Sequence, residues 1–346
     1  MWSEKRFESL GPLVNRELLS SISNYVDLIN SKLDEVIGEQ PPQLQLSLRY
    51  VLKAGGKRIR PLIALLSCAA ICGNPKPAIP VAVAYELAHT AALIQDDIID
   101  KADRRRGKPS AWTIWGVEGA ILIADILLFE IFNIMADYGK PSLETEKLRK
   151  LLRLIGDSAK LTVKGELLEL EVSKKPVITD LEYLEVARLK TGTLFAAPAA
   201  AGALVGGGST SEVSAFYDFA EKFGIAYQIH DDIRDIMGGE ETGEPIFNDI
   251  RNAKKNNIVL IYAMEMARSG EADFIKSLMG KQDISEEEID EARRLLQRLG
   301  AVRRAVHLCQ KYLDDSREIL EKMELRENNA KNMLLALTSI LFESYP

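Results

Sequence analysis

Two copies of one acidic pattern carry the clearest chemistry in this sequence. Both read D-D-x-x-D, and both lie in apolar, helix-periodic stretches far apart along the chain. Residues i and i+4 of a helix share a face, and i+1 lies about 100° away, so each copy should present three carboxylates from roughly one patch. Such clustering is costly among apolar residues unless a cation is bound. We therefore expect a site for Mg²⁺, which takes oxygen ligands and often binds together with phosphate. The candidate ligands are Asp96, Asp97 and Asp100 in the first copy and Asp231, Asp232 and Asp235 in the second.

Basic residues accompany the acidic patterns. The run G-G-K-R-I-R-P at residues 55–61 places cations at a loop-to-helix junction, where a helix N-terminus favours anions. The run R-R-R-G-K-P at 104–109 follows the first acidic pattern, and neither run matches a nucleotide P-loop. His89 lies two turns before Asp96 on the same helix face. Carboxylates for metal and cations for anions together indicate a phosphate-bearing substrate, and the apolar helices between them indicate that its remainder is greasy.

The elements that must position these residues are helices. Helical periodicity predicts segments at 19–37, 44–52, 61–72, 81–100, 120–138, 142–173, 180–204 and 212–237, with three more within 257–345. Strand alternation is nearly absent. We therefore expect a single all-α bundle, with the acidic patterns on two facing inner helices. No composition shift marks a boundary, so residues 1–346 are expected to form one domain.

Composition narrows the class of protein further. The chain has 346 residues and a net charge of −7, so it offers no basic field for nucleic acid. The longest apolar run, near 194–205, falls short of the ~18 residues of a membrane-spanning helix, and no signal peptide is evident. We expect no transmembrane segment and a cytoplasmic location. Cys68, Cys72 and Cys309 lack the nearby ligands of a metal site and are expected to be reduced, buried thiols.

Taken together, these residues resemble the trans-isoprenyl diphosphate synthases (polyprenyl synthetases), in particular geranylgeranyl diphosphate synthases. The resemblance runs from about Leu48 to Leu260 and keeps the family's order of motifs. Besides the two acidic patterns, it rests on the following segments: residues 55–61, Glu86–Asp100 with His89, residues 105–109, Lys190-Thr191, Tyr227-Gln228, Asp249-Ile250 and Lys254-Lys255.

The resemblance implies an isoprenoid synthase helical bundle around a large central cavity. It also implies a Mg²⁺-dependent prenyltransferase, with about three metal ions per active site, that joins isopentenyl diphosphate to dimethylallyl, geranyl or farnesyl diphosphate. The six aspartates would hold the metal, with Asp96, Asp97, Asp100 and Asp231 also counted as catalytic, together with Arg105 and Lys190. Isopentenyl diphosphate would bind to Lys57, Arg60, His89 and Arg106. The allylic diphosphate would bind to Arg105, Lys190, Thr191, Gln228 and Lys254.

The length of the product depends, in this family, on the residues four and five before the first acidic motif. These are Ala92 and Ala91, whose small side chains leave room for a chain longer than fifteen carbons. We expect geranylgeranyl diphosphate (C20), with C25–C35 products as the alternative. A homodimer is also implied by the family.

The chain departs from the family pattern at two places after the second acidic motif. Glu244 stands where a lysine is usual, and Asn256 stands where a threonine is usual. These departures leave open a non-catalytic or regulatory subunit of a hetero-oligomeric synthase. A terpene cyclase, which uses the same metal chemistry, is a further alternative. It would not need the cations at residues 57–60 and 106.

Overall fold

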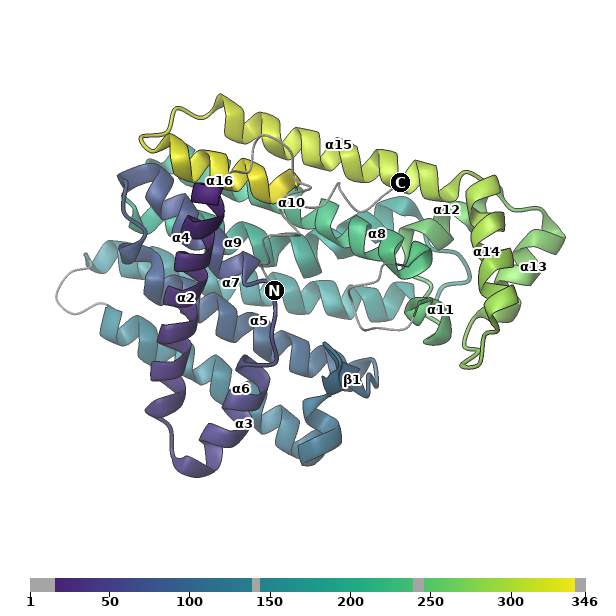
Figure 1. Ribbon diagram of the computed structural model, residues 1–346, viewed down its shortest axis with the longest axis horizontal. Coiled ribbons are helices and arrows are strands. Elements are labelled where there is room, and N and C mark those ends of the chain that lie inside the picture. Colours follow the sequence, from purple (N-terminus) through teal and green to yellow (C-terminus); the bar gives the residue numbers. More distant parts are fainter. Residues whose placement is uncertain (1–15, 139–143, 239–245, 340–346) are drawn as a thin grey trace. The chain divides into compact units, whose positions relative to one another are not determined.

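The computed structural model describes residues 16–138, 144–238 and 246–339. Within these ranges the chain is helical almost throughout, which confirms the prediction of an all-α fold (Figure 1). The two-residue strands β1 (Arg104–Arg105) and β2 (Lys108–Pro109) form the one sheet in the described residues.

The chain divides into two compact units. The first unit comprises residues 1–159, 194–220 and 319–346, and the second comprises 160–193 and 221–318. Four of the described helices contribute residues to both units: α7 (Thr145–Val172), α9 (Thr193–Val205, by its first residue alone), α10 (Thr210–Met237) and α15 (Ala301–Lys322). The first acidic motif lies in the first unit and the second motif in the second unit. The predictions of one domain and of facing motifs therefore stay predictions.

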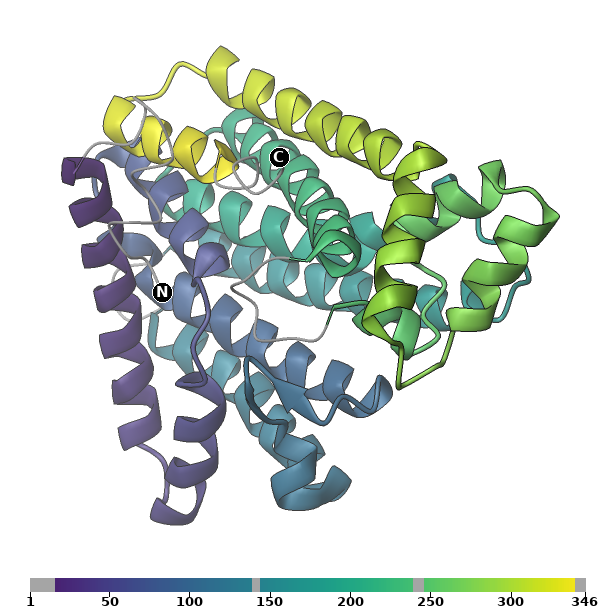
Figure 2. The same ribbon diagram turned by 45° about the vertical axis from the view of Figure 1, so that its right-hand side comes forward.

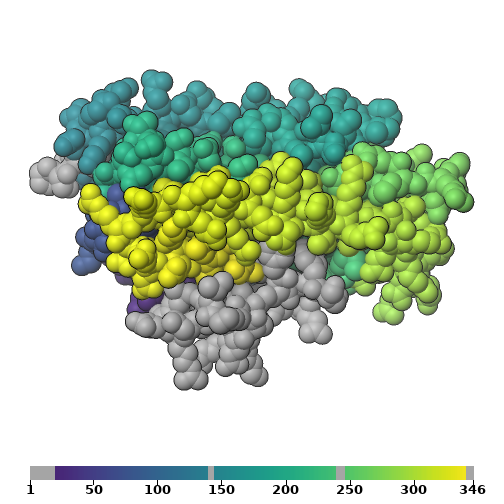
Figure 3. Space-filling view, turned by 90° about the horizontal axis from the view of Figure 1, so that it is seen from above, coloured from purple at the N-terminus to yellow at the C-terminus, as the bar shows by residue number. Residues whose placement is uncertain are grey.

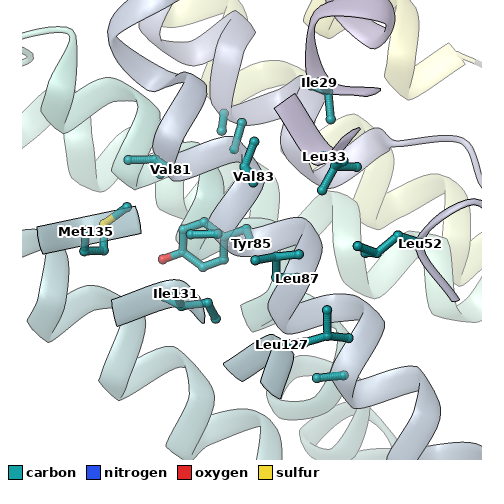
Figure 4. Packing of buried hydrophobic residues seen from close by; sticks show 14 of the residues in the cluster. Ile29, Leu33, Leu52, Val81, Val83, Tyr85, Leu87, Leu127, Ile131 and Met135 are labelled. Carbon is teal, nitrogen blue, oxygen red and sulfur yellow. The ribbon is translucent and has the colours of Figure 1, made fainter. Parts of the chain in front are cut away.

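The first unit is built around the apolar helix α5 (Ile79–Ile99). This helix packs along α6 (Ala111–Tyr138), and Figure 4 shows side chains of both, such as Tyr85, Leu87, Leu127 and Ile131, meeting in one core. Burial of these side chains is the main force that holds the motif-bearing helix in place. The other helices of this unit are α2 (Arg16–Gly38), α3 (Pro42–Leu52), α4 (Ile59–Cys72), the short 3₁₀ helix η2 (Lys76–Ala78), α9 (Thr193–Val205) and α16 (Asn328–Ser339).

The second unit holds shorter helices, several of which are visible in Figure 2. They are α8 (Asp180–Ala187), the π-helical turn η3 (Arg188–Gly192), α11 (Asn248–Arg251), α12 (Ile258–Met266), α13 (Ser269–Leu278) and α14 (Glu286–Arg298). The predicted helix at 180–204 is thus divided by a π turn. The prediction of three helices after residue 257 is wrong, because five lie between Ile258 and Ser339. Short loops with capping residues, such as Ser285, separate them.

Helix α15 shows how the longer helices achieve stability. Ala305, Cys309, Leu313 and Leu320 are buried along one stripe, while the opposite face, seen in yellow-green and yellow in Figure 3, is exposed. Their spacing of four and seven residues is that of an amphipathic helix.

Two described segments are longer apolar stretches than the one singled out from the sequence. Residues 76–99 and 111–138 meet the length and composition of a membrane span, with 61% and 33% of their most apolar windows buried. Helix α6 begins at Ala111, nine residues before its predicted start, and bends at Gly116, where φ is 73°. The expectation that residues 194–205 form the longest apolar run is therefore wrong.

Candidate active site

The first acidic motif closes helix α5, and its carboxylates lie in different surroundings. Asp97 is buried and accepts hydrogen bonds from Arg105 Nε (2.8 Å) and Nη2 (2.5 Å). The same Nη2 lies 3.5 Å from Asp96 Oδ2, and Asp100 is the C-cap of the helix. Burial raises the pKa of Asp97, and the Arg105 guanidinium opposes that rise. Arg105 thus lies against the motif whose bound diphosphate it is predicted to contact.

Arg106 stands in the turn of a small hairpin. Arg105 of β1 pairs with Lys108 of β2, and the two residues between them, Arg106 and Gly107, have φ values of 52° and 75°. Two positive φ values are what a two-residue type I′ hairpin turn requires. The Arg106 guanidinium donates a hydrogen bond to the carbonyl of Gly55. The hairpin is therefore tied to the loop that carries Lys57.

Gly56 makes that attachment possible. Its φ is 127°, and a Cβ built on it would lie 2.6 Å from Arg106 Nη1. A side chain at this position would displace the guanidinium as well as strain the backbone. The glycine pair of the motif therefore lets a cation pack directly on the backbone that leads into Lys57.

Arg60 and His89 meet between α4 and α5. Arg60 Nη1 lies 3.1 Å from His89 Nε2, and the guanidinium also lies over the Phe195 ring, 4.3 Å from its centroid. Burial, followed by the charges of Arg60 and Arg106, lowers the pKa of His89 well below its ordinary value although part of the residue is exposed. The neutral ring accepts from Arg60 at Nε2 and so carries its proton on Nδ1. That Nδ1 has no hydrogen-bond partner among the described residues.

The three carboxylates of the second acidic motif differ in burial. The Asp231 side chain is 44% exposed, whereas Asp232 is buried and accepts a hydrogen bond from the backbone N–H of Ile258 (2.9 Å). Asp235 accepts from the backbone of Asp249 (3.2 Å). Burial and the nearby Asp249 carboxylate raise the pKa of Asp232, and they raise that of Asp235 to about 8. Asp231 is therefore the carboxylate of this motif most open to a ligand.

Two predicted contacts of the allylic diphosphate form a hydrogen-bonded chain that ends in this motif. Thr191 Oγ1 donates to Gln228 Oε1 (2.8 Å), and Gln228 Nε2 donates to Asp232 Oδ1 (3.0 Å). Thr191 belongs to the π-helical turn η3, and π turns within helices occur frequently at functional sites.

Lys190, also in η3, has two acidic partners that sequence reasoning missed. Its Nζ lies 2.7 Å from Glu166 Oε2 and 2.7 Å from Glu169 Oε2, one turn apart on α7. Gly165 permits this approach, since a Cβ there would lie 2.5 Å from the backbone N of Lys190. The spacing Gly-Glu-x-x-Glu was the available signal, but carboxylates on an amphipathic helix usually face solvent.

Of the two residues that depart from the family pattern, the structure describes Asn256. Asn256 Nδ2 donates to Glu169 Oε1 (3.1 Å), so this residue joins the group that holds Lys190. Lys255 Nζ lies 3.4 Å from the carbonyl of Lys175, and the charge of Lys254 opposes the rise in the pKa of Asp235. Glu244 lies outside the described residues.

The alanines before the first motif differ in burial. Ala91 has no exposed surface and belongs to the core of the first unit, whereas Ala92 is partly exposed. Ala92 is therefore the one of the two that borders open space.

Comparison with known proteins shows the family of the chain. A family model described as polyprenyl synthetase matches residues 41–296. The chain belongs to the polyprenyl synthetase family. It is similar to a short chain isoprenyl diphosphate synthase of Methanothermobacter thermautotrophicus, with 33% identity over 329 residues, 94% of this chain and 98% of the relative.

Two solved structures share the fold over nearly their whole length. Geranylgeranyl pyrophosphate synthetase from Pyrococcus horikoshii is 33% identical, with a TM-score of 0.86 over 95% of this chain and 99% of that one. Polyprenyl synthase from Caulobacter crescentus, complexed with calcium and isoprenyl diphosphate, is 27% identical, with a TM-score of 0.82 over 94% and 96% of the two chains. The chain is thus a trans-prenyltransferase of the polyprenyl synthetase family, which uses divalent metal ions with diphosphate substrates.

The carboxylates of the two motifs fit that kind of metal. Among the residues that the structure describes, no three His, Cys, Asp or Glu side chains converge to hold an ion by themselves. Mg²⁺ is usually bound by one or two carboxylates together with substrate phosphates, so a complete protein cage is not required. Asp96, Asp100 and Asp231 offer hard oxygen donors that are at least partly exposed.

Proposed function

We propose that this synthase joins isopentenyl diphosphate to an allylic diphosphate and makes mainly geranylgeranyl diphosphate, with C25–C35 products as the alternative. One observation carries the proposal. A group of cationic and neutral donors, namely Arg60, His89 and Arg106, surrounds the Lys57 loop in the unit that contains the first acidic motif. A cationic group in the same unit as an acidic motif that could hold metal suits a reaction of two diphosphates.

The reaction would proceed by ionisation, condensation and elimination. The allylic C–O bond breaks, and the diphosphate leaves with the electron pair. The isopentenyl double bond attacks the allylic cation, a C–C bond forms, and a proton passes to the departing diphosphate. The product is an allylic diphosphate five carbons longer. Lys190 and Arg105 would stabilise the charge that develops on the leaving group, and Thr191, Gln228 and Lys254 would orient it.

The metal would be Mg²⁺, with about three ions per active site that neutralise the allylic diphosphate when bound. Asp96, Asp97 and Asp100 would hold it from one motif and Asp231, Asp232 and Asp235 from the other. We assign the largest direct contribution in the second motif to Asp231, because its side chain is the exposed one. Asp232 and Asp235 would contribute to metal binding while they keep their hydrogen bonds to the protein.

Isopentenyl diphosphate would be bound by Lys57, Arg60, His89 and Arg106. The unpartnered Nδ1–H of a neutral His89 supports this assignment, because a buried donor without a partner is costly until a ligand accepts from it. Arg60 and Arg106 would add charge-assisted hydrogen bonds to the same diphosphate.

The length of the product would depend mainly on Ala92. A partly exposed alanine one turn before Asp96 leaves space for a growing hydrocarbon chain. Ala91 would act indirectly, through the packing of α5 in the core.

We propose a homodimer in the cytoplasm, and the outer face of α6 supports the dimer. Large apolar side chains, each at least 40% exposed, line this helix: Ile114, Val117, Ile121, Leu122, Phe129 and Phe132. Contiguous exposed apolar surface usually marks an interaction site. Size-exclusion chromatography with light scattering should give twice the 38.5 kDa of one chain. A monomer, or a protein recovered only with vesicles, would contradict this part of the proposal.

A single assay tests the function. The purified protein is incubated with Mg²⁺, labelled isopentenyl diphosphate and each allylic primer in turn. Elongated diphosphates are expected, and Asp231→Asn should abolish them without loss of fold. Activity only after addition of a second subunit would instead indicate a regulatory subunit, for which Glu244 and Asn256 were the sequence arguments. Release of a hydrocarbon would indicate a terpene cyclase.

A further inference from the structure

Arg58 forms a buried ion pair that the proposed reaction does not use. Its side chain is 6% exposed and that of its partner, Glu86, is 4% exposed. Arg58 Nη1 donates to the Glu86 carboxylate, Nη2 donates to the carbonyl of Leu52, and Nε lies 3.3 Å from Asn30 Oδ1. One guanidinium thus connects α2, the end of α3 and the middle of α5 with the start of α4.

Stability alone does not account for this arrangement. Arg58 has φ 50° and ψ 32°, a left-handed conformation that residues with a Cβ rarely adopt. In addition, a buried ion pair is often no more stable than apolar side chains of the same volume, because both charges lose their water. A strained backbone and a desolvated pair therefore need another explanation.

The position of the pair provides one. Arg58 lies between Lys57 and Arg60, and Glu86 lies one turn before His89 on α5. Residues three apart on a helix are neighbours on its surface. Arg58–Glu86 and Arg60–His89 are therefore two successive bridges from the start of α4 to α5, one buried and one partly exposed.

We infer that Arg58 and Glu86 are positioning residues for the isopentenyl diphosphate site. The buried bridge sets the spacing between α4 and α5 and the direction of the loop, so that Lys57, Arg60 and His89 meet the same diphosphate. The inference rests on the proposed function, because it assumes that these three residues bind isopentenyl diphosphate.

A double variant separates positioning from stability. Arg58→Met with Glu86→Leu replaces the ion pair with apolar side chains of similar size, so no unpaired charge is buried. The matched control is Arg304→Met with Glu265→Leu, the same changes at an exposed ion pair of 2.5 Å in the second unit. For each protein, the KM for isopentenyl diphosphate, the KM for farnesyl diphosphate, kcat and Tm are measured.

The double variant should remain folded and show a KM for isopentenyl diphosphate raised by about tenfold or more, because small displacements of binding groups are costly. The KM for farnesyl diphosphate should change by less than about twofold, and the control should match the native protein in both. An unchanged KM for isopentenyl diphosphate in a folded double variant, or an equal rise in both KM values, would overturn the inference.

If the double variant does not fold, the single variant Glu86→Gln tests the inference instead. This change keeps the shape and one acceptor but removes the charge, so the same selective rise, in smaller size, is expected. A Glu86→Gln protein with native KM values would overturn the inference. Failure of the proposed function looks different, because then the native protein itself would not consume isopentenyl diphosphate with any primer.

Discussion

Arg60 Nη1 lies 3.1 Å from His89 Nε2, and the positive charge of the arginine helps to keep the histidine neutral. A cation and a neutral donor therefore stand side by side where two cations would repel each other. This arrangement favours anion binding over a wide range of pH. It also means that His89 contributes to the free energy of unfolding in a way that depends on pH.

The stability of the protein should depend on His89 below about pH 6.5. The unfolded histidine binds a proton near that pH, but the folded one does not until a much lower pH, so acid favours the unfolded state. The His89 contribution is thus fully present above pH 6.5 and is lost as the pH falls, by up to about 1.4 kcal/mol per pH unit. Urea unfolding of the native protein and of His89→Gln at pH 7.5, 6.5 and 5.5 tests this. The free energy of unfolding of the native protein should fall more steeply with decreasing pH than that of His89→Gln.

The control for this experiment is His307→Gln on the exposed side of α15. It should follow the native protein at each pH. If His89→Gln also runs parallel to the native protein, the histidine is not held neutral in the folded state.

Gly56→Ala should weaken the isopentenyl diphosphate site selectively. The new Cβ would meet the Arg106 guanidinium at 2.6 Å and strain a backbone with φ 127°, so Arg106 must move away. We expect the KM for isopentenyl diphosphate to rise by about tenfold or more and that for the allylic primer to stay unchanged. Gly270→Ala in α13, where no atom lies within 4 Å of the new Cβ, is the control and should leave both unchanged. A rise for both substrates in Gly56→Ala would argue against a local effect.

The two alanines before Asp96 should respond differently to enlargement. Ala92→Phe should shorten the main product, because the ring enters space that is open in the native protein. Ala91→Phe should instead destabilise the fold by about 1–3 kcal/mol, since it overfills a packed core. Mass analysis of the products and thermal unfolding of both variants test this pair of predictions. A shortened product from a fully stable Ala91→Phe protein would reverse the assignment.

Lys190→Met should reduce kcat strongly while the protein stays folded. Lys190 is predicted to stabilise the leaving diphosphate, and removal of one such contact typically costs about 10²–10³ in rate. The variant also leaves Glu166 and Glu169 without their shared partner. Turnover at saturating substrates should fall by this amount. Lys175→Met, at an exposed lysine paired with Glu182, should retain native turnover, and equal losses in the two variants would contradict the role of Lys190.

Much of the fold follows from helical periodicity, and the errors have specific causes. The core helices α5 and α10 were predicted almost to the residue because their apolar faces are continuous. The start of α6 was missed because a bend at Gly116 interrupts its pattern. Similarly, the cations of the site were predicted from the resemblance, but their partners were not. Whether Asp97 binds Arg105, or Glu166 binds Lys190, depends on side-chain directions that spacing along one helix does not contain.

The π-helical turn at Arg188–Gly192 makes the site unusually sensitive to the number of residues in this segment of the protein. A π turn holds one residue more than the α-helical turn it replaces, and each residue of an α-helix advances the chain by about 100°. Deletion of a single residue here would let 180–205 become one regular helix. The apolar contacts of α9 would then keep their phase only if Lys190 and Thr191 rotated away from their partners. Deletion of one residue, a minor change in a sequence alignment, would thus leave the protein folded but remove its activity.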